Sequence, residues 1–251
     1  MARSRQRHGY LVELSGGDAA STVVYAAAHA GAGVDWASDL SQALPSDWAV
    51  CGVLLPGRGA RRGEPFATSV ESVAVAVADD VCDRHRTGRR AVFYGQSLGA
   101  LLAFEVCRLL EQRRVVVPTA LAVLGAPAPQ TSPPPAAAGR TDDEIVAELA
   151  DFGGTPAAVL ADVGLRTIVL AILRSDLHLY ENYRWGTCGT IAAPVVAVRG
   201  AEDTAVTAAS MRDWALSTRS DRFEYVEVSG GHLPTRQAAS VWAAWVDNSE
   251  R

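Results

Sequence analysis

The sequence predicts an α/β fold with a mostly parallel sheet. Short apolar segments recur along the 251 residues and alternate with segments whose apolar residues repeat at helical spacing. Such alternation implies crossover connections, which place neighbouring strands parallel to one another. Hydrophobic residues make up 49% of the chain, enough to fill one large core. We therefore expect residues 1–251 to form a single domain.

The first part of the chain is expected to form three strands and two helices. The strands are short apolar runs that end at turn residues, and they cover residues 10–14, 21–30 and 48–55. The first helix covers residues 36–44. The second helix lies where Val70, Val73, Val77 and Val81 repeat at helical spacing.

The later part of the chain continues the same alternation. A strand at residues 92–94 precedes a helix at residues 98–112. Further apolar strands are predicted at residues 116–124, 195–199 and 223–228. A last helix runs from about Pro234 to Trp245.

A helical insertion interrupts the alternation between Gly125 and Pro194, where we predict no strand. Thr141 is placed to cap a helix that has acids in its first turn and an apolar face of Ile145, Leu149 and Phe152. Apolar residues repeat in two more helical stretches, at residues 165–173 and 177–183.

We expect residues 127–186 to form a lid, because inserted helices with apolar inner faces often gate a pocket. An insertion after a strand of a parallel sheet lies at the end of the sheet where ligands bind. Leu165, Ile168 and Ile172 are the lid residues predicted to face the substrate. The alternative is that the helices merely decorate the edge of the sheet.

Charge and hydropathy exclude several classes of function. The net charge of −5 gives no electrostatic reason to expect a nucleic-acid partner. No run approaches the ~20 apolar residues of a membrane-spanning helix, and the basic start lacks the apolar stretch of a secretory signal. We therefore expect a soluble, cytoplasmic protein with no membrane or nucleic-acid partner. We also expect it to be a monomer.

The residues that commonly bind metals are not spaced for a metal site. Cys51, Cys82, Cys107 and Cys188 are too far apart for a C-x-x-C pair. The five histidines show no H-E-x-x-H pattern. We expect unbridged thiols and a protein that needs neither a metal nor a cofactor.

The segment Gly95-Gln96-Ser97-Leu98-Gly99 matches the nucleophile elbow, G-x-S-x-G, between a predicted strand and a predicted helix. The tight turn exposes the serine hydroxyl, and side chains two residues away on either side would collide. The helix that follows points its first N–H groups at the place where an oxyanion would develop. We therefore predict that Ser97 is a catalytic nucleophile.

A serine nucleophile needs a base and an acid, and in this kind of fold the acid precedes the histidine in the chain. His232 follows the last predicted strand and a glycine pair, whereas the competing His178 lies in the predicted lid. Glu202 and Asp203 follow the strand at residues 195–199. We predict His232 as the base and Asp203 as the acid, with Glu202 as the alternative.

The second oxyanion donor is expected in the loop after the strand that neighbours the nucleophile strand. That loop covers residues 29–33. We predict that the backbone N–H groups of Ala30 and Leu98 form the oxyanion hole. His29 precedes the serine, so we interpret it as a turn-shaping residue and not as the base.

Further short motifs accompany the elbow. They are His29-Ala30-Gly31, LPGRG at Leu55–Gly59 followed by RRGEP, FGGTP at Phe152–Pro156, LRSDLHLYENYR at Leu173–Arg184 and GGH at Gly230–His232. Together with GQSLGALLAFE they resemble the type II thioesterases, which are stand-alone editing enzymes of polyketide and nonribosomal peptide assembly lines. The resemblance runs from about Val23 to Trp245. The chain departs from the family's usual G-H-S-M-G elbow, because Gln96 and Leu98 replace histidine and methionine.

The resemblance implies an α/β-hydrolase fold with a helical lid. It also implies hydrolysis of acyl groups from the phosphopantetheine arm of acyl or peptidyl carrier proteins. Gln96 is one of the residues expected to influence the choice of substrate. A carboxylesterase, an acyltransferase, or a carrier-binding module with an inactive triad are the alternative functions.

Carrier proteins of such systems are usually acidic, which draws attention to one basic loop. Arg58, Arg61 and Arg62 follow a predicted strand closely enough to border the site. We expect them to dock the carrier protein. A solvated basic turn is the alternative.

Overall fold

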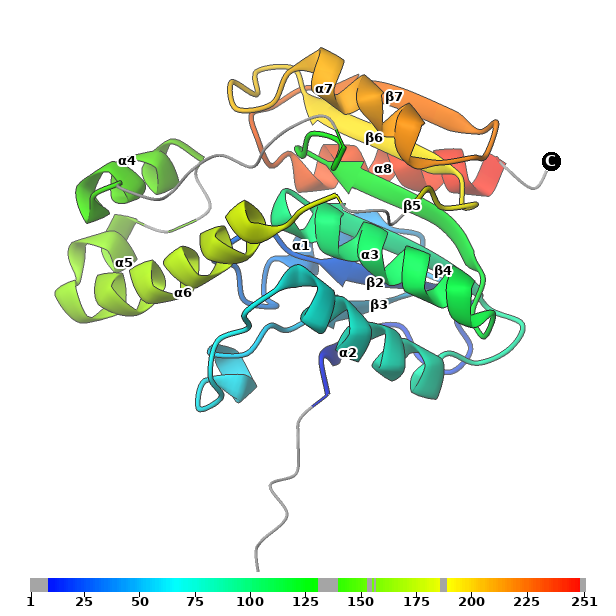
Figure 1. Ribbon diagram of the computed structural model, residues 1–251, viewed down its shortest axis with the longest axis horizontal. Coiled ribbons are helices and arrows are strands. Elements are labelled where there is room, and N and C mark those ends of the chain that lie inside the picture. Colours follow the sequence, from blue (N-terminus) through cyan, green and yellow to red (C-terminus); the bar gives the residue numbers. More distant parts are fainter. Residues whose placement is uncertain (1–8, 131–139, 153–154, 156, 186–188, 249–251) are drawn as a thin grey trace, which may run out of the picture.

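The computed structural model describes residues 9–130, 140–152, 155, 157–185 and 189–248, and it contains one seven-stranded sheet with helices on both faces (Figure 1). The strands are β1 (Leu11–Ser15), β2 (Thr22–Ala27), β3 (Trp48–Val53), β4 (Arg90–Gln96), β5 (Pro118–Leu124), β6 (Val195–Gly200) and β7 (Phe223–Val228). The helices are α1 (Ala37–Ala43), α2 (Val70–Arg84), α3 (Leu98–Arg113), α4 (Asp142–Phe152), α5 (Ala157–Ala161), α6 (Val163–Asn182), α7 (Ala208–Arg212) and α8 (Thr235–Asp247). The predicted α/β fold is confirmed.

The sheet has the strand order β1-β3-β2-β4-β5-β6-β7. β1 pairs antiparallel with β3, and the other neighbouring strands are parallel. The carboxyl ends of β2, β4, β6 and β7 therefore meet at one end of the sheet. Because β2 pairs directly with β4, the loop after β2 lies beside the turn that contains Ser97.

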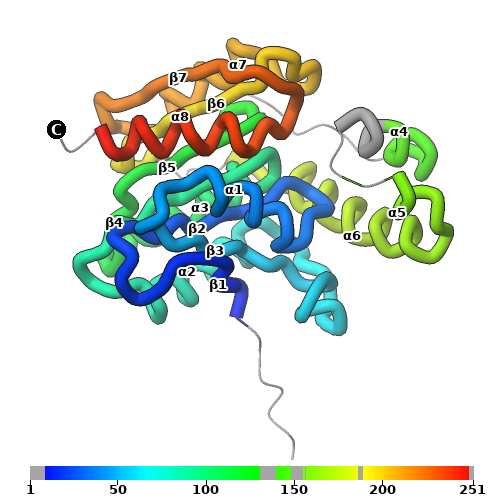
Figure 2. Tube along the Cα trace, turned by 180° about the vertical axis from the view of Figure 1, so that it is seen from behind, coloured from blue at the N-terminus to red at the C-terminus, as the bar shows by residue number. Residues whose placement is uncertain are grey.

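Helices cover both faces of the sheet. α2 and α3 lie on the face that Figure 1 shows, and α1 and α8 lie on the face that Figure 2 shows. Successive residues of a strand point to opposite faces. Accordingly, Phe93 belongs to the core under α2 and α3, whereas Tyr94 stacks on Trp242 of α8 with 5.3 Å between ring centroids.

The inserted helices α4, α5 and α6 extend beyond the end of the sheet (Figure 1). The two stretches predicted at residues 165–173 and 177–183 form the single helix α6, because no break separates them. Helices α5 and α7 were not predicted. Thr141 caps α4 as expected: its Oγ1 accepts the amide of Glu144 at 3.3 Å, and the Glu144 carboxylate accepts the Thr141 amide at 2.7 Å.

Some residues of interest lie outside the described part of the chain. The side chains of Leu149 and Phe152 are among them, as are Cys188 and part of the FGGTP segment. The three cysteines that are described, Cys51, Cys82 and Cys107, are unbridged thiols. No helix among the described residues is long and apolar enough to cross a membrane.

Candidate active site

Ser97 sits at a strained turn between β4 and α3. Its φ of 50° and ψ of −118° are unusual for a residue with a side chain. The turn leaves no room for side chains at the flanking glycines. A Cβ atom on Gly95 would lie 2.2 Å from the Gly99 carbonyl oxygen, and one on Gly99 would lie 2.1 Å from that of Ala27. The steric reason for the G-x-S-x-G pattern is therefore visible in the packing.

His232 and Asp203 are joined by a hydrogen bond. His232 Nδ1 lies 2.8 Å from Asp203 Oδ2, and the Asp203 side chain is fully buried. The other oxygen, Oδ1, accepts the amides of Ala205 at 2.8 Å and Val206 at 3.1 Å. Burial raises the pKa of Asp203, but the hydrogen bond to His232, the His232 charge and the two amides outweigh it and hold the pKa below its usual value.

The two competing residues occupy different positions. The carboxylate of Glu202 is exposed and accepts the backbone amide of Gly230, so it supports the loop before the histidine. His178 is exposed on α6, where its Nδ1 lies 3.0 Å from Asn182 Nδ2. The geometry therefore favours Asp203 and His232 over these alternatives.

Two further glycines let the histidine loop approach the elbow. A Cβ atom on Gly200 would lie 1.8 Å from the Gly231 carbonyl oxygen, and one on Gly125 would lie 3.3 Å from His232 Cε1. The His232 ring thus packs against Gly125. Leu124 directly precedes Gly125, and its carbonyl accepts the amide of Ser97 at 2.9 Å. Ser97 and His232 therefore each contact the Leu124–Gly125 peptide.

The loop after β2 brings Ala30 to the same end of the sheet. Ala30 packs on a small apolar cluster of the helical insertion, formed by Ile145, Leu170 and Leu173. The amide of Leu98 lies at the first residue of α3, directly after Ser97. The two backbone donors predicted for the oxyanion hole thus lie in the segments that follow the neighbouring strands β2 and β4.

His29 lies in this loop and is held neutral. Burial, and secondarily the charge of His232, lowers the pKa of His29 to about 4. Its Nδ1 is enclosed and has no hydrogen-bond partner among the described residues. The influence of His232 on the pKa of His29 is not evident from the positions of the two residues in the sequence.

Gln96 does not face the substrate side. Its side chain is 1% exposed, and its amide nitrogen donates to the hydroxyls of Tyr94 at 3.0 Å and Thr235 at 2.7 Å. These contacts tie the end of β4 to the start of α8. Gln96 is thus a buried structural link, and its influence on substrate choice stays a prediction.

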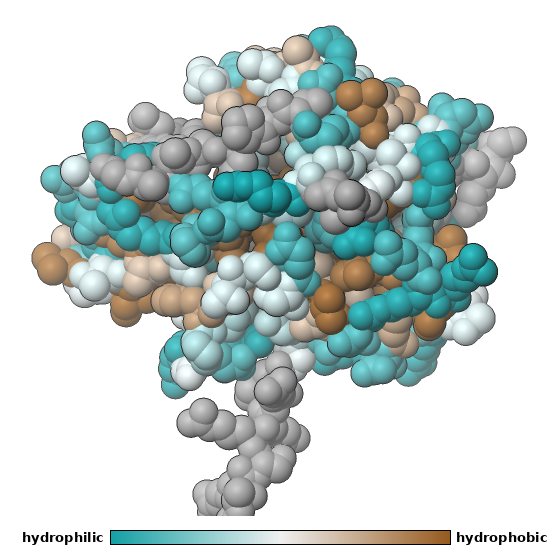
Figure 3. All heavy atoms as spheres, in the orientation of Figure 1, coloured by the Kyte–Doolittle hydropathy of each residue, from teal (hydrophilic) through white to brown (hydrophobic). Residues whose placement is uncertain are grey.

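The three residues of α6 predicted to face the substrate are not among the buried residues of that helix. Leu165 and Ile168 are 47% and 58% exposed, and Ile172 is half-buried. Apolar atoms lie at the surface over α5 and α6 in Figure 3. The buried face of α6 instead carries Leu170 and Leu173. Helical spacing alone could not distinguish these faces, because α6 has apolar residues around much of its circumference.

Two of the three arginines expected to dock a carrier protein are buried. Arg58 and Arg61 are each 5% exposed. Arg58 pairs with Asp176, and Arg61 pairs with Glu64. Arg62 is exposed, so it alone of the three presents its side chain to solvent. The expectation is wrong for Arg58 and Arg61, since contacts within the chain bury their guanidinium groups and occupy their hydrogen-bond donors.

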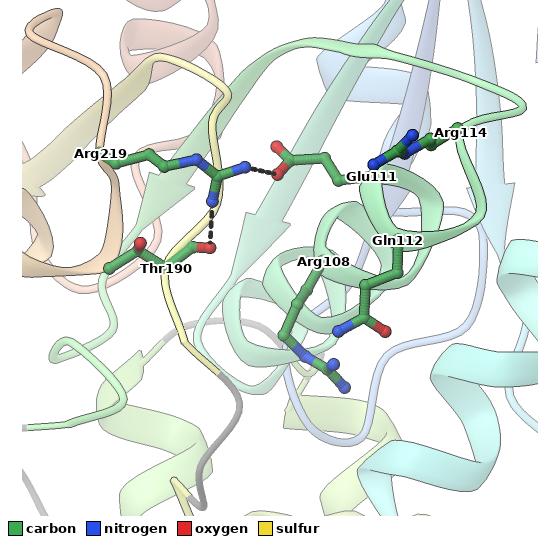
Figure 4. Close-up of a pocket in the computed structure, with 6 residues that line it drawn as sticks. All are labelled: Arg108, Glu111, Gln112, Arg114, Thr190 and Arg219. Carbon is green, nitrogen blue, oxygen red and sulfur yellow. Dashed lines mark hydrogen bonds and ion pairs between the residues drawn. The ribbon is translucent and has the colours of Figure 1, made fainter.

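A hollow of about 380 Å³ lies near the other end of α3, away from Ser97 (Figure 4). It is lined by Arg108, Glu111, Gln112, Arg114, Thr190 and Arg219. Arg219 donates to Glu111 at 2.9 Å and to the Thr190 carbonyl at 2.6 Å. These polar walls do not suit an acyl chain. No cluster of metal-binding side chains occurs among the described residues.

Comparisons with known proteins identify similar sequences. Residues 23–243 match the thioesterase domain family. The thioesterase PikA5 of Streptomyces venezuelae is 35% identical over 205 residues, which are 82% of this chain and 72% of that protein.

Solved structures extend the likeness to three dimensions. RedJ, a thioesterase from the prodiginine biosynthetic pathway in Streptomyces coelicolor, superposes with a TM-score of 0.82 at 29% identity over 91% of each chain. YbtT, a type II thioesterase from the yersiniabactin NRPS/PKS biosynthetic pathway, superposes with a TM-score of 0.83 at 26% identity over 95% of this chain and 97% of its own. The predicted α/β-hydrolase fold with a helical insertion is confirmed.

Proposed function

The chain belongs to the thioesterase family, and we propose that it hydrolyses acyl groups from the phosphopantetheine arm of acyl or peptidyl carrier proteins. It is a thioesterase of the serine hydrolase family and a type II enzyme of nonribosomal peptide and polyketide biosynthesis. The observation that carries the proposed chemistry is the buried Asp203–His232 pair beside the strained Ser97 turn.

The first half of the reaction acylates the enzyme. Since Nδ1 of His232 donates to Asp203, its Nε2 is the nitrogen left to take the proton of Ser97 Oγ. Oγ attacks the thioester carbonyl carbon, and the oxyanion is held by the amides of Ala30 and Leu98. The carbon–sulfur bond then breaks, and His232 returns the proton to the departing phosphopantetheine sulfur.

The second half releases the acyl group. Water loses a proton to His232 Nε2 and attacks the acyl carbon of the Ser97 ester. The ester bond breaks, His232 protonates Ser97 Oγ, and the products are a free carboxylic acid and a carrier protein with a free thiol. Asp203 keeps the imidazole in the productive tautomer and stabilises its positive charge in both halves.

The test is hydrolysis of a panel of acyl carrier proteins loaded with acetyl to long or branched acyl groups. We expect release of free acid and of carrier thiol, with an oxygen ester of matched acyl group cleaved more slowly. Ser97→Ala and His232→Ala should each lower kcat by roughly 10³-fold or more, and the double variant by little more, because the residues act as a unit.

Other outcomes would support the other functions. Equal rates on the thioester and the oxygen ester would indicate a carboxylesterase. Transfer of the acyl group to an added alcohol or amine in preference to water would indicate an acyltransferase. Carrier binding without labelling of Ser97 by a fluorophosphonate would indicate a binding module.

A further inference from the structure

A buried ion pair joins the LPGRG loop to the lid helix. Arg58, in the loop after β3, donates from its two terminal nitrogens to Asp176 on α6, at 2.6 Å to Oδ2 and 2.5 Å to Oδ1. The two side chains are 5% and 1% exposed. A buried pair of this kind contributes little net stability compared with apolar residues of similar volume, so its presence calls for a specific role.

The remaining hydrogen bonds of the pair go to the loop that contains Ala30. Asp176 Oδ2 accepts the amide of Gly31 at 2.8 Å, and the Arg58 guanidinium donates to the Ala32 carbonyl at 3.0 Å. The acid of the ion pair therefore binds the amide of Gly31, and the base binds the carbonyl of the next residue, Ala32. Leu173, one turn before Asp176, packs on the same glycine, since a Cβ atom there would lie 3.3 Å from its Cδ1.

We propose that the Arg58–Asp176 pair positions the loop at residues 29–33, here called the oxyanion loop. In this way it aims the Ala30 amide at the reacting carbonyl. Gly31 has a φ of +85° and little steric restraint of its own, so the Ala30–Gly31 peptide needs outside contacts to stay in one orientation. This peptide directly follows the His29–Ala30 peptide, which carries the Ala30 amide, so fixing the one restrains the other. Oxyanion donors are effective only when they are fixed before the charge develops. Asp176 is thus a positioning residue on the lid helix, and the inference rests on the proposed serine mechanism.

The same helix has a second buried polar anchor, which serves as a control. The Tyr183 hydroxyl donates to Glu105 Oε1 at 2.8 Å, and Arg108 donates to Glu105 Oε2 at 2.7 Å. Glu105 is fully buried on α3. This anchor holds the end of α6 against α3. Losing it should loosen α6 without touching the oxyanion donors.

The main test replaces both charges at once with apolar residues of similar volume, in the variant Arg58→Met/Asp176→Leu. This removes the loop contacts without leaving an unpaired buried charge, so the variant should fold. Asp176→Asn keeps one acceptor oxygen and should have an intermediate effect. Tyr183→Phe is the control. The substrate is a small acyl-pantetheine thioester, which avoids any effect on carrier docking.

We expect the double variant to lower kcat about 10- to 100-fold with a KM within about two-fold of the wild type, because a misplaced donor affects the transition state more than the bound substrate. Binding of a trifluoromethyl ketone, whose adduct with Ser97 carries an oxyanion, should weaken by the same factor. The rate of Ser97 labelling by a fluorophosphonate should fall in parallel. Tyr183→Phe should lower the melting temperature and leave all three quantities near the wild-type values.

Two results would overturn the inference. One is a folded double variant with wild-type kcat and ketone affinity, which would make the pair purely structural. The other is an equal loss of kcat in Tyr183→Phe, which would trace the effect to general loosening of α6. Labelling and ketone binding do not depend on a thioester substrate. A wild type that reacts with both probes but cleaves no thioester would refute the proposed function while still testing the role of the pair.

Discussion

At the scale of single residues, the elbow shows how local sterics create a reactive group. Ser97 adopts a φ of 50° that L residues rarely adopt, and the surrounding glycines are required because backbone atoms occupy the space of their missing Cβ atoms. A residue in such a conformation is held there by its neighbours. The strain is consistent with a serine that must stand clear of the sheet to reach a substrate.

The choice between two adjacent carboxylates is tested by isosteric replacement. Asp203→Asn should lower kcat by roughly 10²- to 10⁴-fold, because the amide favours the wrong imidazole tautomer of His232. Glu202→Gln should retain most of the activity, since that side chain accepts a backbone amide and does not contact the imidazole. Steady-state kinetics on one thioester would compare them. Near-wild-type activity of Asp203→Asn together with an inactive Glu202→Gln would reverse the assignment.

His29 predicts a pH dependence of stability. Its pKa of about 4 in the folded protein lies below the ordinary value, so the unfolded chain takes up this proton first as the pH falls. The folded state should therefore lose stability as the pH drops from about 6.5 towards 4.

Between about pH 7 and about pH 5 this loss should be on the order of 2 kcal/mol greater in the wild type than in His29→Gln. Urea unfolding at both pH values measures the difference. Above neutral pH the two proteins should change in parallel, which serves as the internal control. Identical pH dependence below neutral pH would show that His29 is not held neutral by the fold.

At the scale of elements, helix α6 has several roles along one length. Its middle carries Leu170 and Leu173 to the apolar cluster beside Ala30, and Asp176 to the ion pair. Its end is anchored by Tyr183 to α3. Its first turn is capped by Asp162, which accepts the Leu165 amide at 2.8 Å. The same part of the helix exposes apolar side chains to solvent. Because this buried face of α6 packs beside Ala30, a predicted oxyanion donor, we expect the same face to border the acyl group of the substrate.

Acyl-chain selection should follow that buried face of α6. Leu170→Trp should lower kcat/KM for long acyl groups about ten-fold while acetyl hydrolysis persists, since each methylene in such a pocket is worth about 1–3 kcal/mol. Leu165→Trp is the matched control, because Leu165 is 47% exposed and should change neither rate. The measurement is kcat/KM across a series of chain lengths. Rates that fall equally for every chain length, with a lower melting temperature, would show that this face only stabilises the lid.

At the scale of the whole molecule, segments distant in sequence converge on one end of the sheet. Parallel strands end there, and the segments that meet at their ends are the Ser97 turn, the His29–Gly33 loop, the Asp203 and His232 loops and helix α6. Arg61 illustrates a second kind of convergence. It donates to the Leu54 carbonyl at 2.9 Å, pairs with Glu64 and lies 3.8 Å above the ring of Tyr10, next to the edge strand β1.

Arg61 and Arg62 should therefore respond differently to charge reversal. Arg61→Glu should destabilise the protein by about 2 kcal/mol or more, because it breaks a mostly buried pair and sets two acids side by side. Arg62→Glu should change stability by less than about 0.5 kcal/mol. Thermal unfolding measures both. If Arg62 contacts an acidic carrier protein, its reversal should raise KM for the acyl carrier and spare a small pantetheine thioester; equal effects on both would exclude that contact.

The sequence by itself determined the features that depend on nearby residues. The alternation of strands and helices, the elbow with its glycines and the Thr141 cap follow from periodicity and sterics within a few positions of the chain. The order of serine, acid and histidine also narrowed the candidate site to a few residues. These predictions needed no knowledge of which segments pack together.

Only the tertiary structure decided which side chain meets which. The partner of Arg58 lies 118 positions away, and that of the Gly31 amide 145 positions away. Gln96 points to α8, and α6 buries Leu170 and Leu173 while exposing Leu165, for reasons that lie in the surfaces packed against them. A local pattern shows that a side chain is apolar or charged, but burial depends on the neighbour that covers it. In this protein that neighbour comes from a distant segment.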